Sequence, residues 1–432
     1  MLAILMLFLA SCETWGRGDV DTDMSVGATE SKTELSESSI ESTSDSDSDR
    51  QEESVSESVS ESTSESTSES VSESTSESET EVKQEMITPE NGAVIILAND
   101  DVYGWWKDYF YKKTNYSEPY YLHQDIYYPN DVTFSWIEDA DVDYYRFYIS
   151  TDKDFDASET EGYLVNTPTL TLAHLFTGTK YYWKVVGAKA SADGTSEVSK
   201  TVVSVATFST AESPRCLKVA GVSNTRDIGG WETADGKRVK QGMIYRGGKL
   251  EDITDEGKDF FLYNLNIMTD LDLRTPGEGG AGSVSPLGRG VNYINLDGRY
   301  YTGSKGINNE EGKKIFADEI RLFANPDNYP IYIHCSLGRD RTGTLVFVLQ
   351  SLLGVSKNTM MMDYELSVFS VTGTMDNASV SAIRNNITST YNYISGFDGD
   401  SFSEKTENYL LSIGITPEEI QTIKDLLLEE VE

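Results

Sequence analysis

The stretch that decides the fold is "IYIHCSLGRDRTGTLVFVL", residues 331–349, which places a cysteine and two arginines in a short polar loop between apolar runs. The first run is short, as in a buried strand, and the second is long enough for a helix. This order gathers the backbone N–H groups of residues 336–341 around one point at a helix N-terminus, which favours an anion. The sequence therefore predicts an anion site in an α/β domain.

The anion is predicted to be a phosphate monoester. Cys335 lies at the base of the loop, where the helix end and two arginines should lower its pKa, and a thiolate is the form that attacks phosphorus. Arg341 can bind two phosphoryl oxygens and follow them into the transition state. A structural cysteine before a helix is the alternative, but a thiol, two arginines and Asp340 make poor core material.

The segment "HCSLGRDRTG", residues 334–343, resembles the H-C-x-x-G-x-x-R-[ST]-G signature of cysteine-dependent tyrosine and dual-specificity phosphatases. Residues 224–250 and "DLDLRTPGE", residues 270–278, are similar to two blocks of the bacterial-type secreted tyrosine phosphatases, and residues 409–428 resemble their closing helices. The resemblance covers nearly all of residues 213–432. It implies an α/β cysteine-phosphatase domain with a central sheet flanked by helices.

The resemblance also implies a function for each residue of the loop. Cys335 is the nucleophile, Arg341 binds the phosphoryl group, and Thr342 hydrogen-bonds the thiolate and helps it leave. The other substrate-binding positions are Ser336, Leu337, Gly338 and Arg339. Arg339 stands where many members carry lysine, which keeps the charge but changes its geometry, so a lipid preference drawn from the lysine form is not carried over.

Residues outside the loop are expected to support it. His334 precedes the nucleophile and should orient it through backbone contacts, without transferring a proton. Arg226 and Asp227 are expected to hold the loop in shape. Asp272 and Arg274 are expected to form an internal ion pair.

Two aspartates are candidates for the general acid that protonates the leaving oxygen. Asp297, in "INLDGRYYTGSKG", follows the strand before the phosphate loop, which is the chain position of the acid loop in many relatives. Asp340 lies inside the loop and matches an aspartate that secreted members carry. Asp297 could instead be a turn residue before Gly298, and Asp340 could pair with Arg226 or another arginine to shape the loop. Both candidates stay open at this point.

The first fifth of the chain differs in composition. The 432-residue chain has a net charge of -37, and residues 13–85 are rich in serine and acidic residues. Between Glu53 and Glu77 a glutamate recurs at every fourth position, so like charges would stack on a helix and oppose it. We expect a disordered acidic stalk, which would act as a spacer through a cell wall or as a solubilising tail.

Residues 1–12, "MLAILMLFLASC", form a short apolar run that is typical of an export signal. Its end, Leu9 to Cys12, resembles the lipobox of bacterial lipoproteins, which implies cleavage before Cys12 and a lipid on its thiol. An ordinary signal peptide or a misassigned start is the alternative. The resemblance predicts a protein anchored in the cell membrane through Cys12, on the extracellular face of a bacterium.

Residues 86–210 alternate apolar and polar positions in short runs, which predicts an all-β sandwich. Trp136, Tyr145, Phe147 and the segment 175–190 resemble a fibronectin type III domain. The aromatic segment 101–128, with its two adjacent tryptophans, is longer than a strand connection needs. Core packing or a covering loop is favoured over stacking on a sugar.

Together these features predict a surface phosphatase that hydrolyses phosphotyrosine, with dual specificity also open. Phosphoryl transfer to Cys335 would be followed by hydrolysis of the cysteinyl phosphate, without cofactor or metal. A phosphorylated protein or phospholipid is the expected partner, and no nucleic acid is expected. One rival is a phosphoinositide or inositol-phosphate phosphatase, and another is an adhesin whose phosphatase-like domain only binds.

Overall fold

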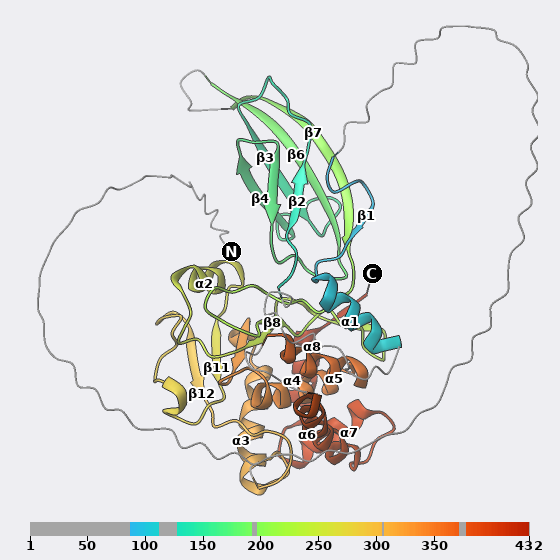
Figure 1. Ribbon diagram of the computed structural model, residues 1–432, viewed down its shortest axis with the longest axis vertical. Coiled ribbons are helices and arrows are strands. Elements are labelled where there is room, and N and C mark those ends of the chain that lie inside the picture. The colour runs from blue at the N-terminus through green and yellow to red at the C-terminus, as the bar shows by residue number, and fades with distance from the viewer. Residues whose placement is uncertain (1–86, 112–127, 192–196, 305, 371–376, 432) are drawn as a thin grey trace, which may run out of the picture. The chain divides into compact units, whose positions relative to one another are not determined.

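The computed structural model describes residues 87–111, 128–191, 197–304, 306–370 and 377–431 (Figure 1). The predicted signal, Cys12 and the acidic stalk lie outside the described residues. Within the described ranges, no helix combines the length and apolar character needed to cross a membrane.

The first described region is built from two sheets. The larger sheet has the order β1-β7-β6-β3-β4, and β2 pairs with β5 in the smaller one. β1 runs parallel to β7, whereas the other pairs are antiparallel. The strands are β1 (Ala93–Ile95), β2 (Val132–Ser135), β3 (Tyr144–Ser150), β4 (Thr160–Val165), β5 (Thr169–Leu172), β6 (Lys180–Ala190) and β7 (Glu197–Thr210).

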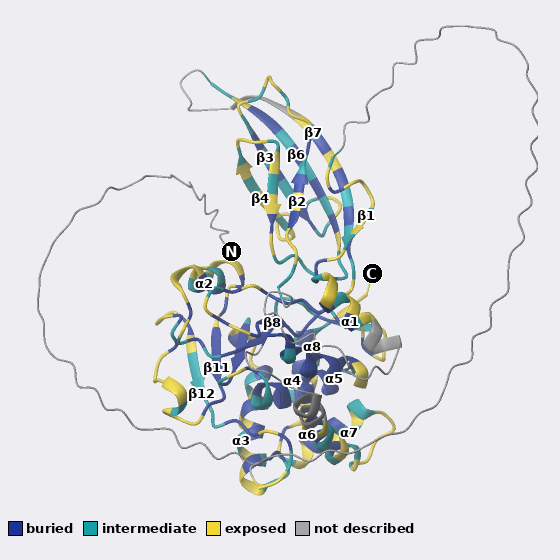
Figure 2. Ribbon diagram, viewed as in Figure 1, coloured by how far each residue is buried: buried dark blue, intermediate teal, exposed yellow. Residues whose placement is uncertain are grey.

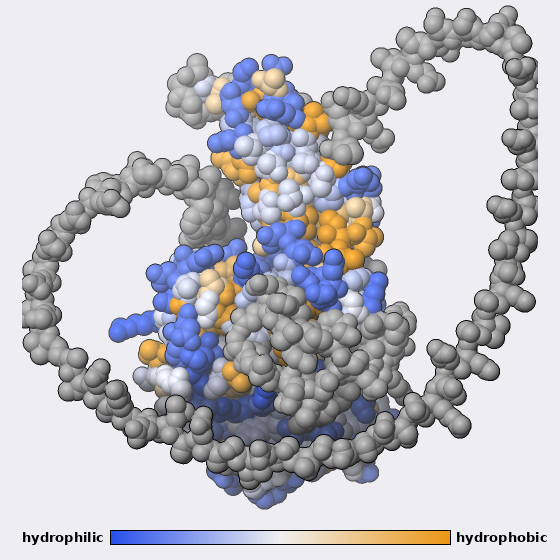
Figure 3. Space-filling model, viewed as in Figure 1, coloured by the Kyte–Doolittle hydropathy of each residue, from blue (hydrophilic) through white to orange (hydrophobic). Residues whose placement is uncertain are grey.

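Aromatic side chains fill the space between these sheets. Phe147 on β3 lies 4.8 Å from Phe134 and 5.7 Å from Trp183, measured between ring centres, and all three are fully buried. The alternation along β3 explains this, since successive residues point to opposite faces. Val94 and Val205 remain exposed, and Figure 3 shows apolar surface over this region. Its likeness to a fibronectin type III domain stays a prediction.

The aromatic segment 101–128 begins with a helix, α1 (Asp100–Tyr111), which the sequence reading did not predict. Residues 112–127 lie outside the described ranges. Trp105 is buried, at 4% exposure, so it has no free ring face for a sugar. Trp106 is half-buried and packs against the hydrophobic cluster that contains Trp105.

The second region has a central sheet of five strands in the order β12-β11-β13-β10-β8. β12, β11, β13 and β10 run parallel, and β8 is antiparallel at the edge. The strands are β8 (Arg226–Asp227), β10 (Ile244–Gly247), β11 (Thr269–Asp272), β12 (Asn292–Asn295) and β13 (Ile331–His334). A separate small sheet pairs β9 (Lys237–Val239) with β14 (Leu428–Glu430). The predicted α/β architecture is present, with β13 in the middle of the sheet.

The helices of this region are α2 (Asp255–Asp259), α3 (Glu310–Arg321), α4 (Asp340–Leu352), α5 (Lys357–Leu366), α6 (Asn377–Ser395), α7 (Phe402–Ser412) and α8 (Pro417–Leu427). Short 3-10 or π turns cover Phe260–Asn264, Glu278–Gly280, Leu322–Ala324, Pro326–Asn328 and Ser367–Phe369. Ser401 and Thr416 each form a capping box, which satisfies backbone groups at the start of α7 and α8.

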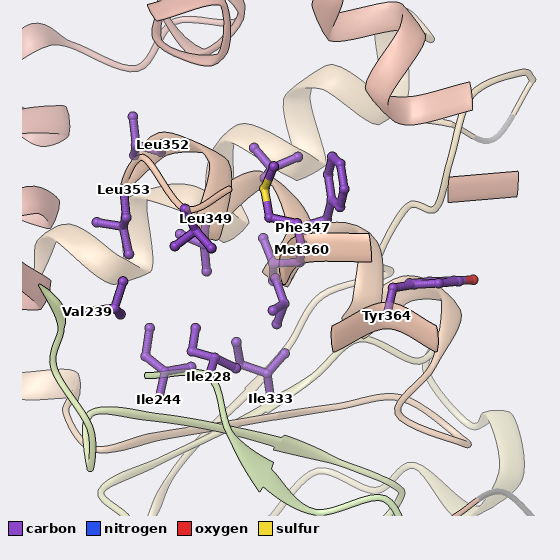
Figure 4. Packing of buried hydrophobic residues seen from close by; sticks show 14 of the residues in the cluster. Ile228, Val239, Ile244, Ile333, Phe347, Leu349, Leu352, Leu353, Met360 and Tyr364 are labelled. Carbon is purple, nitrogen blue, oxygen red and sulfur yellow. The ribbon is translucent and has the colours of Figure 1, made fainter. Parts of the chain in front are cut away.

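Helix α4 is buried along nearly its whole length and is surrounded by the other helices and the sheet (Figure 2). Ile244 and Ile333 from the sheet, and Ile228 directly after β8, face Phe347 and Leu349 of this helix (Figure 4). Its central run, Leu345 to Leu349, is apolar on all sides because every side is covered. The loop between β13 and α4 is therefore held by two elements that are both fixed in the core.

Candidate active site

Cys335 lies directly after β13, at the base of the loop, with only 3% of its surface exposed. Burial raises the pKa of its thiol, but hydrogen bonds from the side chain and backbone of Thr342, the charge of Arg341 and the backbone of Leu337 outweigh it and lower the pKa overall. The Thr342 hydroxyl is buried and has no oxygen or nitrogen partner among the described residues. It is therefore available to the sulfur.

Arg341 is held by a carboxylate that the sequence reading did not assign to the site. Its guanidinium donates to Oε2 and Oε1 of Glu278, at 2.8 and 2.6 Å. Glu278 also accepts the Ser336 hydroxyl at 3.0 Å. The hydrogen bond from Arg341 is the main reason that the pKa of Glu278 falls to about 2. Because the fork of the arginine is fixed on one side, its remaining donors can face an anion in the loop.

Beneath the loop, two buried arginines share one carboxylate. Arg226 Nε donates to Oδ1 of Asp363 at 2.8 Å, and Arg246 donates to the other oxygen. Arg246 also donates to the carbonyl oxygen of Gly338 in the loop, at 2.7 Å. Burial raises the pKa of Asp363, but the charges of the two arginines outweigh it and lower the pKa. The chain between the loop's Cys335 and Arg341 is therefore anchored from below.

Asn224 adds a second anchor. It adopts a left-handed backbone conformation, with φ of 60°, and its amide donates to the carbonyl oxygen of Leu337 at 2.9 Å. Its Oδ1 accepts from Arg226 at 2.6 Å. Arg226 thus reaches the loop through Asn224 and, by way of Asp363, through Arg246.

Asp227 has contacts of a different kind. It forms a buried ion pair with Arg215 at 2.6 Å and accepts the backbone N–H groups of Gly229 and Gly242 at 2.8 and 2.6 Å. These contacts hold the chain around β8 and the turn before β10. Asp227 therefore stabilises the chain next to Arg226, and none of these contacts reaches the loop itself.

Asp340, the first residue of α4, accepts from several donors at once. Arg339 donates from Nε and Nη2 at 2.9 and 3.1 Å, and the hydroxyls of Tyr301 and Tyr364 also donate to it. Burial raises the pKa of Asp340, but these hydrogen bonds and the charge of Arg339 outweigh it and lower the pKa. The arginine partner of Asp340 is thus Arg339, its neighbour in the loop.

Asp297, the other acid candidate, lies after β12 with 39% of its side chain exposed. It accepts the Thr275 hydroxyl at 2.8 Å, and Arg299 lies 3.6 Å away. The next residue, Gly298, donates its N–H to the carbonyl oxygen of Leu273 at 3.0 Å, and Arg341 reaches the same oxygen at 3.3 Å. The turn that carries Asp297 therefore meets the phosphate loop at one shared carbonyl group.

His334 lies at the end of β13, fully buried. Its Nε2 is 2.9 Å from a carboxylate oxygen of Asp270, and its Nδ1 is 3.3 Å from the Cys335 carbonyl oxygen. Burial lowers the pKa of His334, but the charge of Asp270 outweighs it and raises the pKa. The expected pair of Asp272 and Arg274 is present at 2.8 Å.

The region that carries this loop matches a known protein family. Residues 217–429 match the model described as the tyrosine phosphatase family. This region is a tyrosine-phosphatase-family domain. The match runs from shortly after the first β-region to near the end of the chain, and it contains every phosphate-loop residue named above.

Three relatives carry names that assign them to the tyrosine-protein phosphatases. The proteins are from Cupriavidus necator (27% identical over 33% of this chain), Dictyostelium discoideum (38% over 13%) and Debaryomyces hansenii (27% over 28%). The chain spans 59%, 34% and 61% of the lengths of these relatives.

Two solved structures are also similar to the chain. One is the core catalytic domain of the PP-IP phosphatase SIW14 from S. cerevisiae in complex with citrate, which is 20% identical and covers 41% of this chain and 97% of its own, with a TM-score of 0.25. The other is the Siw14 catalytic core, at 18% identity, 45% and 96% coverage and a TM-score of 0.26.

The phosphatase-family domain contains support residues that sequence reasoning missed. Glu278, Arg246, Asn224 and Asp363 all contact the loop or its anchors. Three of them lie in segments quoted for the family resemblance, at 224–250 and 270–278, so a signal was present. Asp363 on α5 lies outside those segments, and only the fold brings it under the loop.

Proposed function

We propose that the tyrosine-phosphatase-family domain is a cysteine-dependent phosphatase acting on phosphotyrosine, with dual specificity open. The supporting observation is the combination of a Cys335 thiol with a lowered pKa and an Arg341 fork aimed by Glu278. A thiolate and a fixed guanidinium around one ring of backbone N–H groups suit a phosphoryl group that changes from tetrahedral to trigonal bipyramidal.

The reaction has two steps. Cys335 Sγ attacks phosphorus, an S–P bond forms, the P–O bond to the leaving group breaks, and a carboxylic acid gives its proton to the leaving oxygen. Water then attacks phosphorus, the same carboxylate takes the water's proton, and the S–P bond breaks to release phosphate and the thiolate. The Thr342 hydroxyl stabilises the departing thiolate through a hydrogen bond.

Asp297 is the stronger candidate for the general acid. Its side chain is more exposed than that of Asp340, at 39% against 33%, and it accepts a single hydroxyl donor, Thr275. Asp340 is occupied by Arg339 and two tyrosines, which stabilise the carboxylate form. An acid must carry a proton before the first step, and these donors oppose that.

The charges near the loop favour a substrate with one phosphate over a polyphosphate. Lys249, whose backbone N–H donates to the Ser336 carbonyl oxygen, pairs with Asp252 at 2.6 Å. Arg339 and Arg274 likewise have carboxylate partners, Asp340 and Glu251. A second phosphate bound by one of these three cations would compete with its carboxylate. This supports phosphotyrosine over a phosphorylated inositol ring.

A panel of phosphotyrosine peptide, phosphoserine peptide, phosphoinositide vesicles and inositol polyphosphates, tested on the chain from Glu13 onward, examines the proposal. We expect phosphotyrosine turnover, and Cys335→Ser should abolish it while vanadate still binds. Cys216→Ser, which alters the other free thiol of the described residues, is the matched control and should stay active. Preferred turnover of the inositol compounds would contradict the substrate assignment, and vanadate binding without any turnover would favour a binding protein.

We further propose that the enzyme is displayed on the outer face of a bacterial membrane by a lipid on Cys12, beyond a stalk of residues 13–85 and a fibronectin type III-like region. The lipobox-like end of the apolar run and the acidic repeat support this. Cys12→Ala should move the protein from the membrane fraction to the medium or leave an uncut precursor. Unchanged fractionation, with no lipid mass on the mature N-terminus, would refute it.

A further inference from the structure

Helix α1 belongs to the chain upstream of residues 217–429, yet one of its faces packs on the phosphatase-family domain. Val102 and Trp105, three residues apart and therefore on one face of the helix, are 1% and 4% exposed. Both belong to the hydrophobic cluster that contains the core residues of α4 and α5. α1 contacts α5 directly (Figure 1).

The contact of Trp105 falls on one particular turn. Its ring centre lies 5.1 Å from that of Phe369, with the rings at 72° to each other. This edge-to-face arrangement is the favoured geometry for two aromatic rings. Phe369 is buried, at 5% exposure, and ends the 3-10 turn Ser367–Phe369 that follows α5.

The same turn holds the anchor of the phosphate loop. The hydroxyl of Ser370 accepts the backbone N–H of Asn224, and the hydroxyl of Ser367 accepts the Asn224 amide at 3.2 Å. Ser367 also accepts Arg226 at 3.2 Å. Asn224 in turn donates to the Leu337 carbonyl oxygen at 2.9 Å. A continuous path of contacts thus runs from Trp105 to the loop.

We propose that Trp105 is a positioning residue for the phosphate loop, so that a segment outside the family match completes the phosphatase site. Trp105 fixes Phe369, the flanking serines then fix Asn224, and Asn224 fixes the loop backbone. The catalytic part of this proposal rests on the proposed function. The structural part, that Trp105 controls the order of the loop, does not.

The test compares two leucine variants in the chain from Glu13 onward. We expect Trp105→Leu to lower kcat for a phosphotyrosine peptide about tenfold and to weaken vanadate binding, because small misplacements of a catalytic loop are costly. Trp105→Phe, which keeps an aromatic edge, should recover most of the loss. Phe323→Leu is the control: Phe323 is fully buried in the same cluster but lies in the turn Leu322–Ala324. It should lower the unfolding temperature and leave kcat within about twofold.

Two further measurements distinguish a failure of the Trp105 inference from a failure of the proposed function. Amide hydrogen exchange at residues 337–339 should be faster in Trp105→Leu than in the wild type and unchanged in Phe323→Leu, whatever the protein catalyses. In a double-mutant cycle, the fold-loss in kcat of the Ser370→Ala and Trp105→Leu double variant should be smaller than the product of the two separate fold-losses. The reason is that both substitutions interrupt the same chain of contacts. Unchanged exchange at the loop, or equal kcat losses in the two leucine variants, would overturn the inference. If exchange at the loop is faster in Trp105→Leu but the wild type shows no turnover, the proposed function is overturned and the structural inference stands.

Discussion

The guanidinium of Arg341 donates to both carboxylate oxygens of Glu278, at 2.8 and 2.6 Å, so the orientation of this loop arginine is set by a residue 63 positions away in the chain. The pair is only partly buried, with side-chain exposures of 15% and 37%. The pair therefore contributes more to the orientation of Arg341 than to the free energy of unfolding.

Glu278→Gln should reduce kcat/KM for a phosphotyrosine peptide by about 10²-fold, because an amide offers one acceptor where Arg341 needs two. Vanadate affinity should fall as well. Glu251→Gln is the matched control, since Glu251 accepts from Arg274, outside the loop, at 2.6 Å. Equal effects of the two substitutions in steady-state kinetics would show that Glu278 does not aim the arginine.

The two acid candidates can be separated by the leaving group. Asp297→Asn should reduce hydrolysis of a phosphotyrosine peptide by roughly 10² to 10⁴, and hydrolysis of a highly activated aryl phosphate much less, because an activated aryl oxide departs without a proton. Asp340→Asn should slow both substrates alike and weaken vanadate binding, because it releases Arg339 and two tyrosines. The reverse pattern in the rate ratios would place the acid inside the loop.

Asp363→Ala should destabilise the fold by about 3 to 5 kcal/mol, because it leaves Arg226 and Arg246 buried without their shared carboxylate. Urea unfolding of the purified protein measures this. Asp318→Ala removes an exposed pair with Arg321 and should cost less than about 1 kcal/mol. Comparable losses would mean that the buried arginines find other partners.

Glu319→Gln should stabilise the protein at neutral and alkaline pH. Glu319 on α3 is fully buried, neither of its carboxylate oxygens has a partner among the described residues, and burial raises its pKa well above the ordinary value of 4.5. When folding raises the pKa of a carboxyl, the folded protein is fully stable below the pKa of the unfolded state. As the pH rises from there toward the folded pKa, the unfolded state ionises first and the free energy of unfolding falls.

The advantage of the glutamine variant should thus be absent near pH 4, grow above pH 4.5 and level off once Glu319 ionises in the folded protein. Thermal unfolding across pH measures it, with Glu429→Gln, an exposed position on β14, as the control. A pH-independent difference between Glu319→Gln and the wild type would contradict an unpaired buried carboxyl.

The loop between β13 and α4 could be predicted because it is contiguous in the chain: Cys335 and Arg341 lie in one segment, between a strand and a helix. The partners of these residues could not, because Glu278 and Asp363 come from distant segments that only the fold brings together. For the same reason the sequence left open which arginine pairs with Asp340, and the structure shows Arg339. Sequence spacing shows which residues are charged, but not which of several carboxylates each arginine meets.

Helix α1 was missed for another reason. Val102, Trp105 and Trp106 follow helical spacing. The aromatic residues around them and the alternating strands downstream are also typical of sheet packing, so the spacing alone did not favour a helix. What the spacing could not reveal is the surface that this helix covers. That depends on Phe369, more than 200 residues further along the chain.

The shared carboxylate under the loop also has an electrostatic consequence. Arg226 and Arg246 contribute two positive charges and Asp363 one negative charge, so the triad carries +1 in a protein whose formal charge is -37. Repulsion between the acidic molecule as a whole and a phosphorylated substrate is screened by salt over about 8 to 10 Å. The buried surplus lies too close to the loop to be screened in this way. The triad thus offsets, next to the loop, part of the repulsion that the acidic protein exerts on anions at long range.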